Sequence, residues 1–347
     1  MTIVEQARAF TGIWEKEYPF ESNWLDLGEA RLHYVDERSA GSLEAIVAKQ
    51  QPAPAGDVSS AAVVGETPTT GAGETPALLF LHGNPTWSFY WRHLIQQFRT
   101  SNRCVAMDHM GCGLSDKPQF YPYTLAQHIE NARALVYKLD LRDIVLCVHD
   151  WGGAIGMGLA AQIPDRIKGF VVFNTAAFPS RRMPLSIGLC RLPGFGALAI
   201  RGLNAFVRGA LARCAKKPLS AEGKAGYLAP YSNWDDRIAN LRFVQDIPMG
   251  PGHESWETIK EVEAGLAQFK QHPMLLCWGR HDFVFNDHFL HEWQQRFPQA
   301  ETQYFEQAGH FVVEDARAEI IAAMKKFLAG EKQTYTDEHH SSVNLHA

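Results

Sequence analysis

The most specific chemical signal in the sequence is an aspartate at the point where a strand-like run gives way to a helix. The run Ile144–Gly153 reads IVLCVHDWGG, apolar at first and closing on a pair of glycines. A strand, a tight turn and a helix in this order form the setting of a nucleophile elbow, which exposes one side chain at the end of the strand. Asp150 stands where hydrolases usually carry a serine, so we predict that it is a nucleophile. The plainer alternative is an aspartate that caps an ordinary helix.

An aspartate in this position changes the reaction to be expected. A carboxylate is already ionised at pH 7, so it can attack an electrophilic carbon directly. Displacement at a saturated carbon gives an ester that water can later cleave, whereas a serine would give an ether and stop. Asp150 therefore argues against ordinary esterases and lipases. It favours the cleavage of carbon–halogen bonds, epoxides or strained lactones.

Two further polar residues follow Asp150 in the order expected of an acid and a base. Asp282 comes after a short apolar run, and His310 comes just before the last predicted helix. Nucleophile, acid and base follow one another in this order in α/β-hydrolases. The other position for the acid, at the end of the strand after the elbow, holds Asn174, which has no charge. We predict His310 as the base and Asp282 as the acid that orients it and stabilises its imidazolium form, with Asp287 as the fallback.

Hydrogen-bond donors lie close to this nucleophile in the sequence. The loop Phe80–Trp87 ends an apolar run, and in this class such a loop supplies one oxyanion N–H while the residue after the nucleophile supplies the other. These would be the backbone amides of Asn84 and Trp151. Their side chains, an amide and an indole, could also form a cradle for a departing halide or carboxylate, each donor contributing about 3–4 kcal/mol. Alternatively, the loop is a plain turn and Trp151 only packs.

A parallel sheet is needed to bring these residues together. Short apolar runs recur at Leu78–Leu81, Cys104–Met107, Ile144–Val148, Phe170–Phe173 and Met274–Cys277. Runs that are apolar on both faces are typical of central strands covered by helices. Helix-length segments such as Thr124–Leu139 and Gly153–Ile163 alternate with them, and Asn23–Glu37 has the pattern of a hairpin. The sequence therefore predicts an α/β-hydrolase fold with a mostly parallel, doubly wound sheet.

The alternation of strands and helices is interrupted once, by helix-like segments alone. An all-helical insertion in a parallel sheet predicts a cap over the carboxyl ends of the strands, where ligands bind. We accordingly expect a core of residues 1–37 and 78–178, a flexible low-complexity insertion at 38–77, a helical cap at 179–269, the second part of the core at 270–330 and a polar tail at 331–347.

Composition excludes several classes of protein. The 347 residues carry 33 basic and 38 acidic side chains, so there is no basic excess that would indicate a nucleic-acid partner. No apolar run approaches the roughly 18 residues of a membrane span, and the N-terminus has no signal-peptide pattern. Six cysteines without a CxxC pair predict buried free thiols in a cytoplasmic protein. Nothing supplies a metal-ligand cluster or a phosphate loop, so we expect no metal and no cofactor.

The predicted cap has an unusual charge pattern. From Arg181 to Lys217 it carries eight basic residues and no acidic one, among many apolar side chains. This suits a small apolar or lipid-like substrate, a membrane surface, or assembly through the cap with another copy or with other pathway enzymes. An amphipathic cap with solvated arginines is an equal alternative.

Taken together, these motifs resemble the haloalkane dehalogenase family. The resemblance rests on His82–Pro85, Asp108–Pro118, His149–Gly153, Gly279–Asp282 and Gly309–His310, and extends from about residue 20 to 330 except for the low-complexity insertion. It implies an aspartate nucleophile at Asp150, a histidine base at His310, and a halide held by Asn84 and Trp151.

The flanking segments are most similar to the third subfamily of these dehalogenases, and within it to the β-lactone decarboxylases of bacterial olefin synthesis. The similarity lies in Asn174–Pro179, Tyr227–Trp234 and Arg242–Pro248. It implies conversion of a cis-3-alkyl-4-alkyloxetan-2-one to a cis-alkene and CO₂. Three alternatives stay open: a true haloalkane dehalogenase, an epoxide hydrolase that uses Tyr227 and Tyr231 as acids, and a scaffold subunit without turnover.

Overall fold

The computed structural model describes residues 12–38 and 75–331, and almost all of the predicted insertion at 38–77 and tail at 331–347 lies outside these residues. The core is one eight-stranded sheet with the order β1-β2-β4-β3-β5-β6-β7-β8. Its strands are β1 (Asn23–Asp26), β2 (Arg31–Glu37), β3 (Ala77–Leu81), β4 (Cys104–Met107), β5 (Ile144–Asp150), β6 (Ile167–Thr175), β7 (Met274–Gly279) and β8 (Glu301–Phe305). Only the pairings of β2 with β1 and with β4 are antiparallel. The mostly parallel sheet, the amino-terminal hairpin and all five predicted strands are confirmed.

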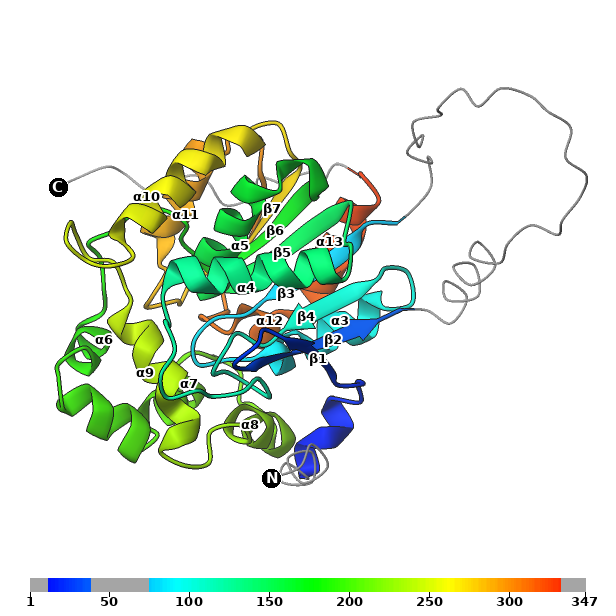
Figure 1. The fold of residues 1–347 in the computed structure, drawn as a ribbon. Coiled ribbons are helices and arrows are strands. Elements are labelled where there is room, and N and C mark those ends of the chain that lie inside the picture. The colour runs from blue at the N-terminus through cyan, green and yellow to red at the C-terminus, as the bar shows by residue number, and fades with distance from the viewer. Residues whose placement is uncertain (1–11, 39–74, 332–347) are drawn as a thin grey trace, which may run out of the picture.

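Alternate residues of the central strands face two different layers of helices. Every residue of β3 and β5 is buried, as expected for strands covered on both sides. Leu79 and Leu81 belong to a buried cluster that also contains residues of α4 (Leu125–Lys138), α5 (Trp151–Gln162), α10 (Trp256–Gly265) and α11 (Asp287–Arg296). Leu78 and Phe80 pack on the other side with α3 (Arg92–Phe98), α12 (Val312–Asp315) and α13 (Arg317–Leu328). Figure 1 shows α4 lying across one face of the sheet.

Between β6 and β7 the described residues form helices only. These are α6 (Leu185–Cys190), the π-helix η4 (Ala197–Gly202), α7 (Ala205–Arg213), α8 (Ala221–Leu228), the short turn η5 (Asp235–Arg237) and α9 (Ile238–Gln245), followed by α10 and η6 (Leu266–Phe269). Helices α6 to α9 gather beyond one end of the sheet (Figure 1). In contrast, Ile259 of α10 and Phe269 of η6 belong to the core that packs on the sheet. Helix α10 also packs on α5, so the carboxyl-terminal part of the predicted 179–269 insertion is joined to the helix layer of the core, although its Ile259 still lines the cavity beside Asp150.

Two expectations from composition can be compared with the described chain. All six cysteines are free, and five are buried as predicted. Cys190 is the exception, because it lies partly exposed on α6 of the cap. No helix within residues 12–38 and 75–331 is long and apolar enough to cross a membrane.

Candidate active site

Asp150 is the last residue of β5, and its backbone is bent as a nucleophile elbow requires. Its φ of 51° and ψ of −124° lie in a region that non-glycine residues rarely adopt, and α5 begins at the next residue. The turn is so tight that only glycine fits after it. A Cβ on Gly152 would lie 2.0 Å from the Leu81 carbonyl oxygen, and one on Gly153 would lie 1.9 Å from Thr175 Oγ1. The paired glycines therefore permit the turn that presents Asp150.

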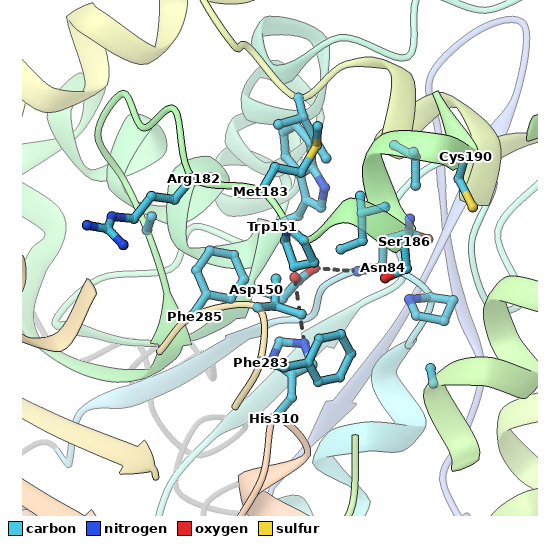
Figure 2. Close-up of a pocket in the computed structure, with 18 of the residues that line it drawn as sticks. Asn84, Asp150, Trp151, Arg182, Met183, Ser186, Cys190, Phe283, Phe285 and His310 are labelled. Carbon is cyan, nitrogen blue, oxygen red and sulfur yellow. Dashed lines mark hydrogen bonds and ion pairs between the residues drawn. The ribbon is translucent and has the colours of Figure 1, made fainter. Parts of the chain in front are cut away.

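The Asp150 carboxylate lies between the backbone amide of Asn84 and the His310 ring. The Asn84 amide donates to Asp150 Oδ1 at 2.7 Å, and His310 Nε2 lies 3.7 Å from Asp150 Oδ2 (Figure 2). Burial raises the pKa of Asp150, while His310 and the backbone amides of Asn84 and Trp151 offset part of that rise. The two amides that the sequence predicts as an oxyanion pair thus both act on the carboxylate.

His310 is tied to a second carboxylate on its other side. His310 Nδ1 lies 2.7 Å from Asp282 Oδ2, and both side chains are buried. Asp282 is fixed in turn, because its Oδ1 accepts hydrogen bonds from the amides of Val284 at 2.6 Å and Phe285 at 3.0 Å. Burial alone would lower the pKa of His310, but Asp282 and Asp150 outweigh it and raise that pKa above its ordinary value. His310 therefore lies between two carboxylates, with Asp282 bonded to its Nδ1 and Asp150 facing its Nε2.

The other candidates for the acid are engaged elsewhere. Asp287 lies at the start of α11, where its Oδ1 accepts a hydrogen bond from the Tyr304 hydroxyl at 2.8 Å. Asn174 joins two strands: its Nδ2 donates to the Gly279 carbonyl at 3.2 Å, and its Oδ1 accepts from the Gly279 amide at 2.8 Å. Neither is bonded to His310, so the structure favours Asp282 over the fallback Asp287.

Several residues to which the sequence assigned no role of their own support the site. His149 donates from Nε2 to the His310 carbonyl at 2.9 Å, and the two rings lie 4.5 Å apart. The Thr175 hydroxyl donates to the Asp150 carbonyl. A Cβ on Gly83 would lie 2.1 Å from Asp150 Oδ1, so a glycine is needed beside the carboxylate. These contacts join positions far apart in the chain, and no local pattern indicates them.

The side chains of Asn84 and Trp151 both face the cavity, but only one is unengaged. Asn84 Nδ2 donates to the Asn240 carbonyl of α9 at 3.1 Å, which leaves the second hydrogen of this amide for a ligand. The Trp151 indole packs against Phe243 with ring centroids 5.2 Å apart, and its Nε1 has no hydrogen-bond partner among the described residues. Both side chains of the predicted anion cradle therefore contact helix α9 of the cap, Asn84 through a hydrogen bond and Trp151 through ring packing.

A cavity of about 310 Å³ lies above these residues, and most of its lining is apolar. Figure 2 shows Asp150 and His310 on one side of it, with Met183, Phe283 and Phe285 around them. Cap residues lining it include Met183, Ile187, Cys190, Phe206 and Val244. A pocket of this kind suits an apolar substrate with one reactive group.

Tyr227 and Tyr231, the candidate acids of an epoxide hydrolase, do not line this cavity. The Tyr227 hydroxyl donates to Glu314 Oε1 at 2.6 Å, and the Tyr231 hydroxyl donates to the Thr86 carbonyl at 3.3 Å. Both are therefore structural links between cap and core, and this alternative loses its proposed acids.

Comparison with known proteins agrees with the geometry. A family model described as alpha/beta hydrolase fold matches residues 76–316. The chain is 41% identical to a cis-3-alkyl-4-alkyloxetan-2-one decarboxylase of Shewanella oneidensis, over 74% of this chain and 83% of the relative. It is 30% identical to haloalkane dehalogenase 2 of Mycobacterium tuberculosis, over 88% of this chain and 94% of the relative. The crystal structure of a haloalkane dehalogenase from Bradyrhizobium elkani superposes with a TM-score of 0.74 at 23% identity, covering 90% of this chain and 98% of that one.

Proposed function

The chain belongs to the α/β-hydrolase fold family, in the branch that holds β-lactone decarboxylases and haloalkane dehalogenases, and from that premise we propose that it is a β-lactone decarboxylase. The substrate would be a cis-3-alkyl-4-alkyloxetan-2-one, and the products a cis-alkene and CO₂. The observation that carries this proposal is the carboxylate nucleophile Asp150, facing an apolar cavity in a chain that is 41% identical to such a decarboxylase. We also propose Asp150, His310 and Asp282 as its catalytic set.

In the first step, an Asp150 carboxylate oxygen attacks ring carbon C4 of the lactone. The C4–O bond breaks, its electron pair remains on the departing carboxylate, and an alkyl ester forms on Asp150 with inversion at C4. The second N–H of Asn84 and the Trp151 indole N–H are the donors available to that new carboxylate. Attack at the carbonyl carbon is less suitable, because this carbon would then be bonded to Asp150 and could not leave as CO₂.

In the second step, the carbon–carbon bond to the carboxylate breaks and its electron pair forms the double bond. The ester C–O bond breaks at the same time and returns the electron pair to the Asp150 carboxylate. Inversion followed by an anti elimination converts a cis-lactone to a cis-alkene. No water, proton or oxidant is consumed. A protonated His310, 3.7 Å from Asp150 Oδ2, stabilises the carboxylate as it leaves.

The test is a product assay on the purified full chain with two matched substrates. One reaction contains a cis-dialkyl β-lactone and the other a 1-bromoalkane of similar length, and alkene and bromide are quantified. We expect alkene from the lactone and little bromide from the bromoalkane. The variant Asp150→Asn should form neither alkene nor bromide. Bromide release with an inert lactone would overturn the decarboxylase proposal and retain the family.

Hydrolysis of a haloalkane is the second candidate, supported by the two cavity-facing donors beside Asp150 and by the 30% identical dehalogenase. In that reaction Asp150 displaces the halide, and a neutral His310 activates water to cleave the alkyl ester. His310→Ala would then accumulate the ester. Intact-mass measurement after incubation with a bromoalkane should show the alkyl increment, and an unchanged mass would count against this route.

A further inference from the structure

The exposed apolar side chains of this protein are concentrated on one part of the cap. Among the described residues, ten large hydrophobic side chains are exposed, and six of them come from the single stretch 185–203. Two more are joined to this stretch through Arg201, whose guanidinium lies 4.6 Å from the Trp234 ring and donates to Gln119 Oε1, next to Phe120. We call these eight residues the cap patch: Phe120, Leu185, Leu189, Leu192, Phe195, Leu198, Leu203 and Trp234.

The cap patch presents apolar side chains to water at positions where a surface segment normally carries polar ones. Apolar residues recur every three or four positions from Leu185 to Leu198, and their exposed fractions lie between 44% and 80%. The other side of the same stretch is also apolar, because Ile187, Cys190 and Ala197 pack against the small cap core around Ile200. The stretch is therefore apolar on both sides. Concentrated exposed apolar surface of this kind marks an interaction site.

The sequence segment that carries most of the cap patch is rich in basic side chains. Arg181, Arg182 and Arg208 are exposed, and none has an ion pair within the described chain. Residues 181–217 carry eight basic and no acidic side chains, which leaves 25 basic and 38 acidic residues, a net charge of −13, for the rest of the chain. Two acids follow Trp234 in the sequence: Asp235 forms an ion pair with Arg201, and Asp236 accepts hydrogen bonds from Ser232 and Asn233 and keeps its charge.

The same stretch forms part of the cavity wall. Met183, Ile187 and Cys190 line the cavity, while Leu185 and Leu189 of the same helix α6 face outward. Figure 1 places α6 at the outer margin of the cap. Helix α6 alone therefore separates the exposed Leu185 and Leu189 from the apolar cavity. Material bound at the patch would therefore lie beside the cavity that contains Asp150.

We propose that the cap patch docks on an anionic lipid bilayer. The exposed leucines and Phe195 enter the boundary between headgroups and acyl chains, and the surrounding arginines contact anionic headgroups. Charge complementarity selects this occupant, because a second copy would bring the same basic surface against itself. The docked position would let an apolar substrate pass from the bilayer to the cavity. This last consequence rests on the proposed function, whereas docking itself does not.

The test is flotation of the full chain with vesicles in the absence of substrate. Vesicles of phosphatidylcholine are compared with vesicles that contain roughly one third phosphatidylglycerol. The double variant Leu185→Glu, Phe195→Glu removes the apolar contact. The matched control is Ile13→Glu, Tyr137→Glu, because these residues are 55% and 51% exposed outside the patch. The charge variant is Arg181→Gln, Arg208→Gln, and thermal unfolding of each variant verifies its fold.

We expect the native chain to bind the anionic vesicles more tightly than the neutral ones. The patch variant should lose at least about tenfold in partitioning, the charge variant about fivefold for each arginine that reaches the surface, and the control less than twofold. No flotation of the native chain, or equal loss in the control, overturns the proposal. A dimer that the patch variant dissociates, without vesicle binding, would assign the patch to a second copy instead. Since no substrate is present, failure of the decarboxylase assay would leave this result unaffected.

Discussion

Replacing Asp282 by asparagine tests which protonation state of His310 the reaction uses. The Asp282 carboxylate is buried and lies 2.7 Å from His310 Nδ1, while its other oxygen accepts two backbone amides. Asparagine keeps an oxygen for those amides, so its NH₂ group turns toward His310. The variant therefore removes the charge next to the imidazolium with little change in shape, and it favours the tautomer that carries hydrogen on Nε2.

The size of the effect follows from this distance. At an effective dielectric constant of about 20, two unit charges 2.7 Å apart attract by about 6 kcal/mol. Removing one partner of a buried pair costs about 3–5 kcal/mol in practice. We take the lower figure, because the variant retains the two backbone hydrogen bonds of the acid. At 1.36 kcal/mol per power of ten, the step that needs the imidazolium slows by about 100-fold.

The direction in which the rate changes with pH differs between the two reactions. Asp282 and Asp150 hold the pKa of His310 above its ordinary value against the effect of burial. Proposed decarboxylation uses the charged His310, so its rate falls as pH rises through this pKa. Hydrolysis of an alkyl ester uses the neutral His310, so its rate falls as pH decreases through the same pKa. In Asp282→Asn the effect of burial dominates and lowers the pKa of His310. The pH at which either rate changes therefore moves to a lower value.

The assay is kcat/KM for alkene formation against pH, measured for the native chain, for Asp282→Asn and for Asp287→Asn. Asp287 is a suitable control because it is an exposed aspartate at the start of α11, bonded to Tyr304 and not to His310. We expect a basic limb that moves to lower pH only in Asp282→Asn, with a rate about 100-fold below the native one. An unchanged rate and limb in that variant, or the same change in both variants, would refute the assigned role of His310.

Two further predictions concern Gly83 and Asp246. Gly83→Ala should lower kcat/KM by roughly 100-fold, because the new Cβ would lie 2.1 Å from Asp150 Oδ1, whereas Gly250→Ala, with nothing within 4 Å, should not. Burial raises the pKa of Asp246 to about 6, so its protonation favours the folded state. Thermal unfolding should show the native chain gaining roughly 2–3 kcal/mol relative to Asp246→Asn as pH falls from about 7 to 4, and a constant difference would contradict this.

The sheet was predictable because its central strands are buried on both faces and leave a continuous apolar run in the sequence. The prediction of strand boundaries fails where residues of a strand are not hydrophobic. β6 begins at Ile167, three residues before the predicted run, because Lys168 is exposed and Gly169 has no side chain. Helix α3 was not predicted, since its first residue Arg92 is a buried charge, paired with Glu17 and Glu314 in the folded chain.

The residues of the candidate site could be predicted where a local sequence motif marks them. Asp150 could be recognised from its flanking strand and glycines, and Asp282 and His310 from their positions after strands. The bond from Asn84 Nδ2 to the Asn240 carbonyl joins residues 156 positions apart, and that from His149 to the His310 carbonyl joins residues 161 apart. Such contacts depend on how the cap and the last strands pack, which no local spacing encodes.

The protonation state of His310 also bears on how one site could support two reactions. Both proposed routes pass through an alkyl ester on Asp150, and they diverge only in what happens to it. A neutral His310 can accept a proton from water and so directs the ester to hydrolysis. A protonated His310 cannot, and its charge instead favours departure of the Asp150 carboxylate. Because Asp282 raises the pKa of His310, it extends to higher pH the range in which a charged His310 can favour elimination, and the mostly apolar cavity wall disfavours the water that hydrolysis needs.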